Sequence, residues 1–256
     1  MPAVSAHYQF GQLVSEKLEN PIKQIVIDNK SMFDIGLQGP DIFFFYKPYK
    51  DNYVSSYGSE VHSNSAADFF RQAILHSFDD KELLAYLMGV ACHYALDREC
   101  HPYINSVSRN KIEHRTVELD FEHYIIKYYN LNENIYVYIP TEDINYDAIE
   151  VAYNRFSSKI IKKSIVSVKK YLRLLMHRKL VILLEGIINK RGTFSSMALK
   201  KGFPYSFDAL KLNSFFNKSV LKAVSLINEI YYAWLSRSNT LYDFLMNFQG
   251  ETNKEE

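Results

Sequence analysis

The stretch HYALDRECHPY, residues 93–103, sets three potential metal ligands, His93, Asp97 and His101, at four-residue steps. Side chains four residues apart on an α-helix lie on one face, one turn from each other. His93 and Asp97 can therefore bind one cation from adjacent turns, and His101 is aimed at it from the helix end. Gly89, one turn earlier on this face, leaves space beside it.

The residues before this stretch predict a long helix that opens at Asp79 or Asp80. Its apolar stripe recurs at three- and four-residue steps, as a core-facing helix requires. The stripe consists of Leu83, Leu84, Leu87, Met88, Ala91 and Ala95. Pro102 disfavours helical geometry at the residue before it. We therefore expect the helix to end near Cys100.

A second pair of ligand type, His114 and Glu118 in HRTVE, follows on the next predicted helix at the same spacing. Imidazole and carboxylate groups are ligands for zinc and similar cations. A single pair of this kind is most often a surface hydrogen-bonding pair. Two pairs on consecutive helices, with His101 at their junction, favour a metal site.

The helical period recurs through most of the 256 residues. Only 9 Gly and 7 Pro are present, which argues against a loop-rich β architecture. The exception is the segment from Gln38 to Asn64, whose Gly, Pro and Asn residues predict a long loop crowded with aromatic side chains. The sequence predicts an all-α fold, a single-domain multi-helix bundle over residues 1–249, with a flexible polar tail at 250–256.

The N-terminal residues MPAVSAHYQF lack the basic and apolar regions of a signal peptide. No apolar stretch reaches the ~18 residues of a transmembrane helix. Cys92 and Cys100 lie eight residues apart on one predicted helix, too far for a disulfide unless the helix breaks, so we expect reduced core thiols. These features predict a cytoplasmic protein.

Five motifs occur in a fixed order: HYQFG from His7, LQGPD ending at Asp41, GSEVH ending at His62, HYALDRECHPY from His93 and HRTVE from His114. As a set they resemble the zinc-dependent phospholipase C family, whose fold is shared with single-strand-specific zinc nucleases. The resemblance covers about residues 1–120.

The resemblance implies a ligand set for two zinc ions and for a possible third. The first ion is matched by Asp41, His62, His93 and Asp97, and the second by His101, His114 and Glu118. His7 matches a ligand of a third ion, which Asp97 would bridge to the first. The chain departs from the secreted members in two respects: it begins only six residues before His7, and the step from Asp97 to His101 is tighter.

The implied activity is hydrolysis of a phosphodiester in a phospholipid. Metal ions polarise the phosphoryl group and activate a water molecule that attacks phosphorus. Asp41 is the candidate general base. Two alternatives remain open: a nuclease or small-molecule phosphodiesterase that uses the same metal ligands, and a non-catalytic zinc-binding helical protein.

Two further segments could contact a substrate. The aromatic stretch between Asp41 and His62 supplies polar-tipped candidates for a pocket wall, although core filling explains them equally well: Tyr46, Tyr49, Tyr53 and Tyr57. Net charge is only +1, yet residues 155–179 hold nine Lys or Arg and no acidic residue. This basic segment could contact a membrane surface or a nucleic acid, but a solvated helix face is the simpler interpretation. No obligate protein partner is evident from the sequence.

Overall fold

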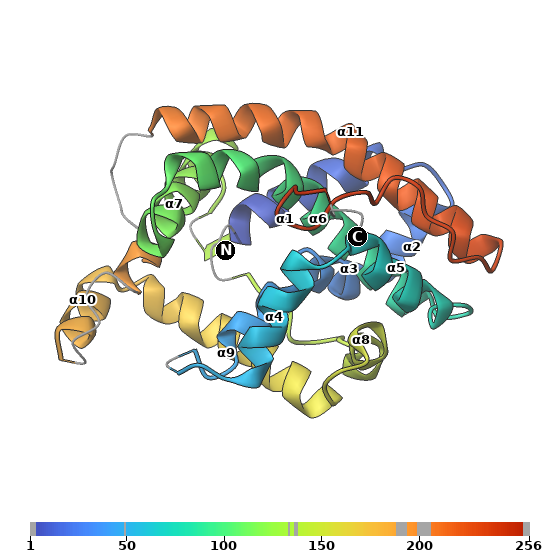
Figure 1. The fold of residues 1–256 in the computed structure, drawn as a ribbon, viewed down its shortest axis with the longest axis horizontal. Coiled ribbons are helices and arrows are strands. Elements are labelled where there is room, and N and C mark those ends of the chain that lie inside the picture. Colours follow the sequence, from blue (N-terminus) through green and yellow to red (C-terminus); the bar gives the residue numbers. More distant parts are fainter. Residues whose placement is uncertain are drawn as a thin grey trace.

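The computed structural model describes residues 4–48, 50–132, 134–135, 138–187, 194–198 and 206–252. Within these residues the chain is helical and forms no strand, which confirms the all-α prediction (Figure 1). The elements are α1 (Val4–Lys17), α2 (Ile22–Asp28), α3 (Lys30–Gly36), the 3-10 helix η1 (Gly39–Phe45), α4 (Tyr53–Ser63), α5 (Ala66–Leu75), α6 (Lys81–Val107), α7 (Lys111–Tyr128), α8 (Tyr146–Tyr153), α9 (Ser158–Leu175), α10 (Arg178–Ile187), the 3-10 helix η3 (Ser195–Met197) and α11 (Phe207–Leu235).

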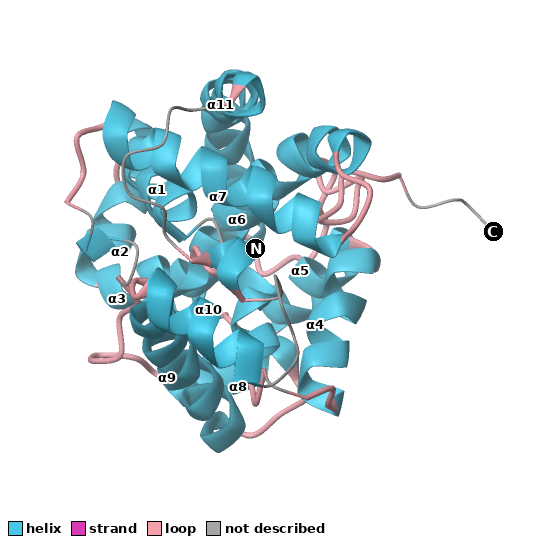
Figure 2. Cartoon of the chain, turned by 90° about the vertical axis from the view of Figure 1, so that its left-hand side faces the viewer, coloured by secondary structure: helices cyan, strands magenta, loops and turns pink. Residues whose placement is uncertain are grey.

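Helix α6 is the central element of the bundle. Asp80 caps its first turn by accepting a hydrogen bond from the backbone N–H of Leu83. Every residue from 83 to 98 is buried, because α1, α3 and α11 all pack against this helix. Figure 1 and Figure 2 place α11 on one side of the bundle and α9 on the opposite side.

Helices α3 and α6 cross at two glycines. A Cβ atom on Gly89 would lie 2.2 Å from the carbonyl oxygen of Phe33, and one on Gly36 would lie 2.3 Å from that of Tyr86. The space expected beside Gly89 is therefore filled by the backbone of α3. This close approach fixes the position of Leu37, whose carbonyl oxygen lies 3.1 Å from Nδ1 of His93.

The prediction that the central helix ends near Cys100 is wrong, since α6 continues through Pro102 to Val107. Proline removes one backbone hydrogen bond from a helix, but packing on both sides can hold the chain in helical geometry. Cys100, His101 and Ile104 are all buried around Pro102. His101 consequently stands within the helix, one turn beyond Asp97.

The long loop predicted from Gln38 to Asn64 is also wrong, because it contains η1 and α4. Asn52 caps α4 by accepting hydrogen bonds from the backbone N–H groups of Val54 and Ser55. The composition of α4, with four serines and a glycine, has low helix propensity. Tertiary packing overrides that propensity, and it places Asp41 and His62 on short helical segments.

The chain after α11 returns across α6. Tyr94 donates a hydrogen bond from its hydroxyl to the carbonyl of Met246, and Arg98 donates one to the carbonyl of Asp243. Gly250 lies so close that a Cβ atom there would be 2.2 Å from the carbonyl oxygen of Arg98. Of the predicted polar tail, residues 253–256 lie outside the described residues.

Both cysteines are buried and form no disulfide, as predicted. Among the described helices, none has the length and apolar character that crossing a membrane would require.

We expect Gly89→Ala to destabilise the protein by about 3 kcal/mol, because its methyl group would overlap backbone atoms of α3 that cannot move aside alone. Gly186→Ala on α10 is the matched control, since a Cβ atom there meets nothing within 4 Å. The control should gain about 0.5–1 kcal/mol. Urea unfolding measures both, and equal effects of the two variants would contradict a steric limit at the α3–α6 crossing.

Candidate metal centre

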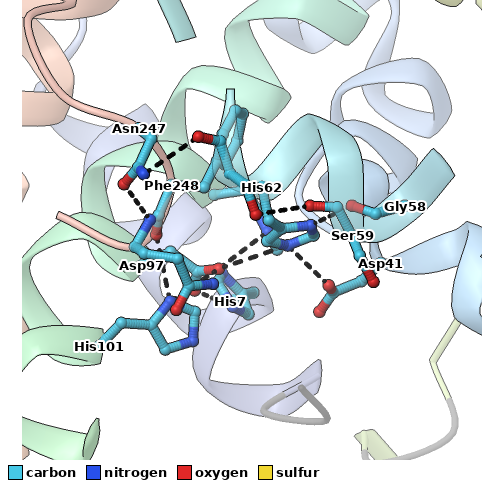
Figure 3. Close-up of polar contacts among 12 residues, drawn as sticks. His7, Asp41, Gly58, Ser59, His62, Asp97, His101, Asn247 and Phe248 are labelled. Atoms are coloured by element: carbon cyan, nitrogen blue, oxygen red, sulfur yellow. Dashed lines mark hydrogen bonds and ion pairs between the residues drawn. The ribbon is translucent and has the colours of Figure 1, made fainter. Parts of the chain in front are cut away.

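Eight histidine and carboxylate side chains from five elements converge in the centre of the molecule, and Figure 3 shows His7, Asp41, His62, Asp97 and His101 among them. They come from α1, η1, α4, α6 and α7. Their ligand atoms form three groups, in each of which all atoms lie within 4.8 Å of one another. The groups are His7 with His93 and Asp97, Asp41 with His62 and His93, and His101 with His114 and Glu118.

Asp97 lies between several imidazoles. Its Oδ1 is 3.2 Å from Nε2 of His7, and its Oδ2 is 3.2 Å from Nε2 of His93. The rings of His7 and His93 stack with centroids 4.2 Å apart. His62 and His101 approach the same Oδ2 at 3.9 and 3.7 Å. One carboxylate therefore connects α1, α4 and α6.

Asp41 and His62 complete this side of the site. Nε2 of His62 lies 3.0 Å from Oδ1 of Asp41. The pKa of Asp41 is lowered although burial would raise it, and the hydrogen bond from His62 and the charges of His62 and His93 contribute to this lowering. The Asp41 carboxylate is therefore held in its ionised form, which is the form that binds a cation or accepts a proton.

The remaining group lies where α6 and α7 meet. Oε1 of Glu118 is 3.2 Å from Nε2 of His114 and 3.7 Å from Nε2 of His101. Burial lowers the pKa of His101, but the charge of Asp97 and the hydrogen bond with Glu118 outweigh burial and raise it to about 9. The pKa of Glu118 lies well below its usual range although burial would raise it, and the hydrogen bonds from His101 and His114 contribute to this lowering.

Backbone carbonyls orient three of the imidazoles. Nδ1 of His62 lies 2.6 Å from the carbonyl oxygen of Gly58, Nδ1 of His93 lies 3.1 Å from that of Leu37, and Nδ1 of His101 lies 3.1 Å from that of Phe248. A carbonyl can only accept, so each Nδ1 carries a proton, and each Nε2 faces the carboxylates, where its lone pair becomes available to a metal ion once its own proton is released. Ligand histidines in metal sites are oriented in this way.

Gly39 allows the His93 ring to occupy its position. Its backbone has a φ of 49°, in the left-handed region that favours glycine. A Cβ atom there would lie 2.6 Å from the imidazole of His93. Gly39 of LQGPD is thus favoured both by its backbone conformation at the start of η1 and by its contact with the candidate ligand His93.

The residues present fit zinc. Ligand atoms bound at about 2.1 Å to one tetrahedral zinc ion lie about 3.4 Å apart, close to the 3.0–3.2 Å of the nearest pairs here. Nδ1 of His7 is buried and has no hydrogen-bond partner among the described residues. Neutral imidazoles with carboxylates are the ligand set of zinc sites.

A cavity of about 720 Å³ opens onto two of the three groups, the one with Asp41 and His62 and the one with His101 and His114. Four candidate ligands contribute to its wall: Asp41, His62, His101 and His114. One side is aromatic, with Phe44, Phe45, Tyr171 and Phe194, and basic side chains from Lys50, Arg109, Lys111 and Arg115 also line it. The cavity can therefore hold a molecule that carries both an apolar and an anionic part.

The tyrosines predicted for the pocket wall lie elsewhere. Tyr46 is buried and has the ammonium groups of Lys47 and Lys163 near its ring. Tyr57 donates a hydrogen bond to the carbonyl of Tyr153, and Tyr53 packs its ring against Phe156. None of the three lines the cavity, because the turns of η1 and α4 direct Phe44 and Phe45 to it instead. Tyr49 lies outside the described residues.

Sequence reasoning missed the residues that hold the ligands in place. Asn247 is one: its amide accepts hydrogen bonds from the backbone N–H groups of Gln249 and Glu251 and donates to the carbonyl of Ser63. This arrangement presents the carbonyl of Phe248 to His101 (Figure 3). No local sequence pattern indicates that His101 contacts the carbonyl of Phe248, which lies 147 residues away along the chain.

Glu122 is a second such residue. It is fully buried on α7, and its carboxylate accepts hydrogen bonds from the backbone N–H groups of Ser5 and Ala6, at 2.6 and 3.1 Å. These N–H groups belong to the first turn of α1, where helical partners are lacking. Glu122 thus anchors the turn that carries His7. The sequence offered one sign of this residue: Glu122 lies four residues after Glu118, and therefore on the same face of the helix as that candidate ligand.

The fold and ligand arrangement define a helical protein whose buried histidines and carboxylates have the composition of a multi-metal site. A family model described as zinc-dependent phospholipase C matches residues 6–167. The chain belongs to the zinc-dependent phospholipase C family, which confirms the resemblance drawn from the motifs. The match includes all eight candidate ligands and reaches α9. Comparisons with curated proteins and with solved structures gave no match.

We expect Glu122→Ala to destabilise the protein by about 2–3 kcal/mol, because it leaves two buried backbone N–H groups without an acceptor. Glu122→Gln keeps one acceptor oxygen and should cost about 1 kcal/mol. Glu142→Ala, at an exposed carboxylate, is the control and should change little. Urea unfolding compares the three, and a Glu122→Ala protein as stable as the control would refute the anchoring role.

Proposed function

We propose that this protein hydrolyses a phosphodiester bond of a phospholipid and releases diacylglycerol and a phosphorylated head group. The observation that carries the proposal is that ligands from two of the candidate groups line one cavity. Asp41 and His62 belong to one group, and His101 and His114 to the other. Structural metal sites are closed, whereas catalytic ones keep an open position for water or substrate. His114, a quarter exposed, and Asp41 support an open site.

The ligand groups support two zinc sites. Asp41, His62, His93 and Asp97 would hold the first ion, and His101, His114 and Glu118 the second. His7 with Asp97 would contribute to a third. Zinc bound there would polarise the phosphoryl oxygen, lower the pKa of a water molecule and offset charge in the transition state.

The side chains themselves supply orientation and proton transfer. Asp41 is ionised, lines the cavity and is held by His62, so it can accept the proton of the attacking water. Water adds to phosphorus as the bond from phosphorus to the glycerol oxygen breaks, and the leaving oxygen takes up a proton. The aromatic wall of Phe44, Phe45 and Tyr171 supports an apolar part of the substrate.

A nuclease or small-molecule phosphodiesterase remains the second candidate. Lys50, Arg109 and Lys111 at the cavity favour a substrate with more than one anionic group, and a polynucleotide has that property. The aromatic wall would then stack bases. The apolar side chains of Phe44 and Phe45 beside the candidate ligands favour the phospholipid, whose acyl chains they could contact.

Metal content tests the ligand assignment. We expect protein purified without a histidine tag to contain about two to three zinc equivalents by elemental mass spectrometry. His93→Ala and His114→Ala, one in each candidate site, should each lower the content by about one equivalent. His177→Ala, at an exposed histidine, is the control. Protein that takes up no zinc even when supplied with it would contradict the proposal.

Asp41→Asn tests the reaction. We expect it to reduce kcat at least about 100-fold, because the variant loses its general base and a charged ligand. Asp68→Asn, at an exposed carboxylate on α5, should retain wild-type turnover. Substrates should include short-chain phosphatidylcholine, a soluble chromogenic phosphodiester and single-stranded DNA.

Turnover of the lipid and the chromogenic ester is the expected result. Cleavage of DNA without cleavage of lipid would favour the nuclease. Zinc-loaded protein that turns over none of the three substrates would leave the non-catalytic alternative.

A further inference from the structure

Helix α10 has a reversed distribution of polar and apolar side chains. Its inward-facing Glu185 is only 2% exposed and accepts hydrogen bonds from Ser195, from the backbone N–H at 2.8 Å and from the hydroxyl at 2.6 Å. Arg178 donates to the carbonyl of Ala198 at 3.0 Å. Arg178 and Glu185 thus serve internal contacts of this helix.

The outward face of α10 is aliphatic. Leu180, Leu183 and Ile187 are 45%, 63% and 72% exposed, and their three- and four-residue steps put them on one face. That face lies opposite the buried Val181 and Glu185. Soluble helices normally present the opposite arrangement, so a continuous aliphatic face on a ten-residue helix indicates a surface that another apolar phase covers.

The neighbouring helix α9 presents a basic face. It packs against α10 and buries one apolar stripe, while its exposed residues include Lys159, Lys162, Lys163, Lys170 and Arg173. No acidic residue occurs from Arg155 to Lys179. Aliphatic residues beside a lysine-rich helix face are the composition of segments that lie in the interface of an anionic membrane.

Helix α9 lines the cavity directly, and α10 is bonded to a segment that also lines it. Tyr171 of α9 lines the cavity, and so do Phe194 and Met197 of the segment that contains Ser195, a hydrogen-bond donor to Glu185. Figure 1 places α10 at one end of the molecule, beside the end of α9, and Figure 2 looks onto that end. A lipid surface on α10 would therefore lie near the cavity mouth.

A second copy of this chain fits the surface less well. A two-fold contact through α10 would bring the basic faces of two α9 helices together, and like charges across an interface cost several kcal/mol in general, which a bilayer with anionic lipids avoids. We propose that α9 and α10 form a docking surface for an anionic lipid bilayer, with Leu180, Leu183 and Ile187 inserted among the head groups. The proposal concerns binding alone and does not depend on turnover.

Vesicle flotation tests the docking surface, with Asp41→Asn protein used so that the lipids stay intact. We expect binding to vesicles of phosphatidylcholine and phosphatidylserine to exceed binding to phosphatidylcholine alone by about tenfold, and to weaken with salt. Adding Leu183→Glu and Ile187→Glu together should reduce binding about tenfold or more. Leu221→Glu, at a 68% exposed position on α11, is the matched control and should bind normally.

Each alternative has its own result. Unchanged binding of the Leu183→Glu, Ile187→Glu protein, with its helix content and Tm intact, would overturn the proposal. So would a concentration-dependent dimer that the same substitutions abolish, since a second copy would then cover the surface. The Leu183→Glu, Ile187→Glu protein with Asp41 intact should cleave a soluble phosphodiester at the wild-type rate if the proposed activity is correct. Loss of membrane binding can therefore be distinguished from lack of activity.

Discussion

Asp97 is a buried negative charge that histidines from three helices surround, and the rest of the structure is arranged around this one carboxylate. A charge removed from water must be compensated by partners close to it. Burial would raise the pKa of Asp97, but the charges of His101 and His93 and the hydrogen bond from His7 hold it well below its usual range. Because those partners lie on α1 and α6, the charge ties the N-terminal helix to the central one.

The site also depends on how the imidazole rings are oriented, and distant parts of the chain fix this orientation. The α3–α6 glycine crossing positions the carbonyl that holds His93, and the returning C-terminal segment positions the one that holds His101. The packing of α3 and of the C-terminal segment on the central helix therefore also directs imidazole nitrogens to one place. That preorganisation suits cation binding, since ligands that need not rearrange lose little entropy.

The sequence predicts the ligand residues far better than it predicts what surrounds them. His93, Asp97, His114 and Glu118 could be found because helical spacing is a local property, whereas His7, Asp41 and His62 needed the motif set. The continuation of α6 through Pro102 and the helix α4 could not be found, because tertiary packing overrides local propensity there. Glu122 and Asn247 act across more than 100 residues of chain, which no local pattern reveals.

The two halves of the molecule differ in how they use charge. Around α6 the charged groups are buried, mutually paired and oriented by backbone carbonyls, which gives one rigid arrangement. On α9 the basic residues face solvent, and on α10 several aliphatic residues face solvent as well. Exposed aliphatic side chains add nothing to the core and so do not stabilise the isolated chain. A sequence that tolerates such exposure beside the mouth of its cavity is explained if that face meets a partner, and a substrate that is itself a lipid supplies one of matching chemistry.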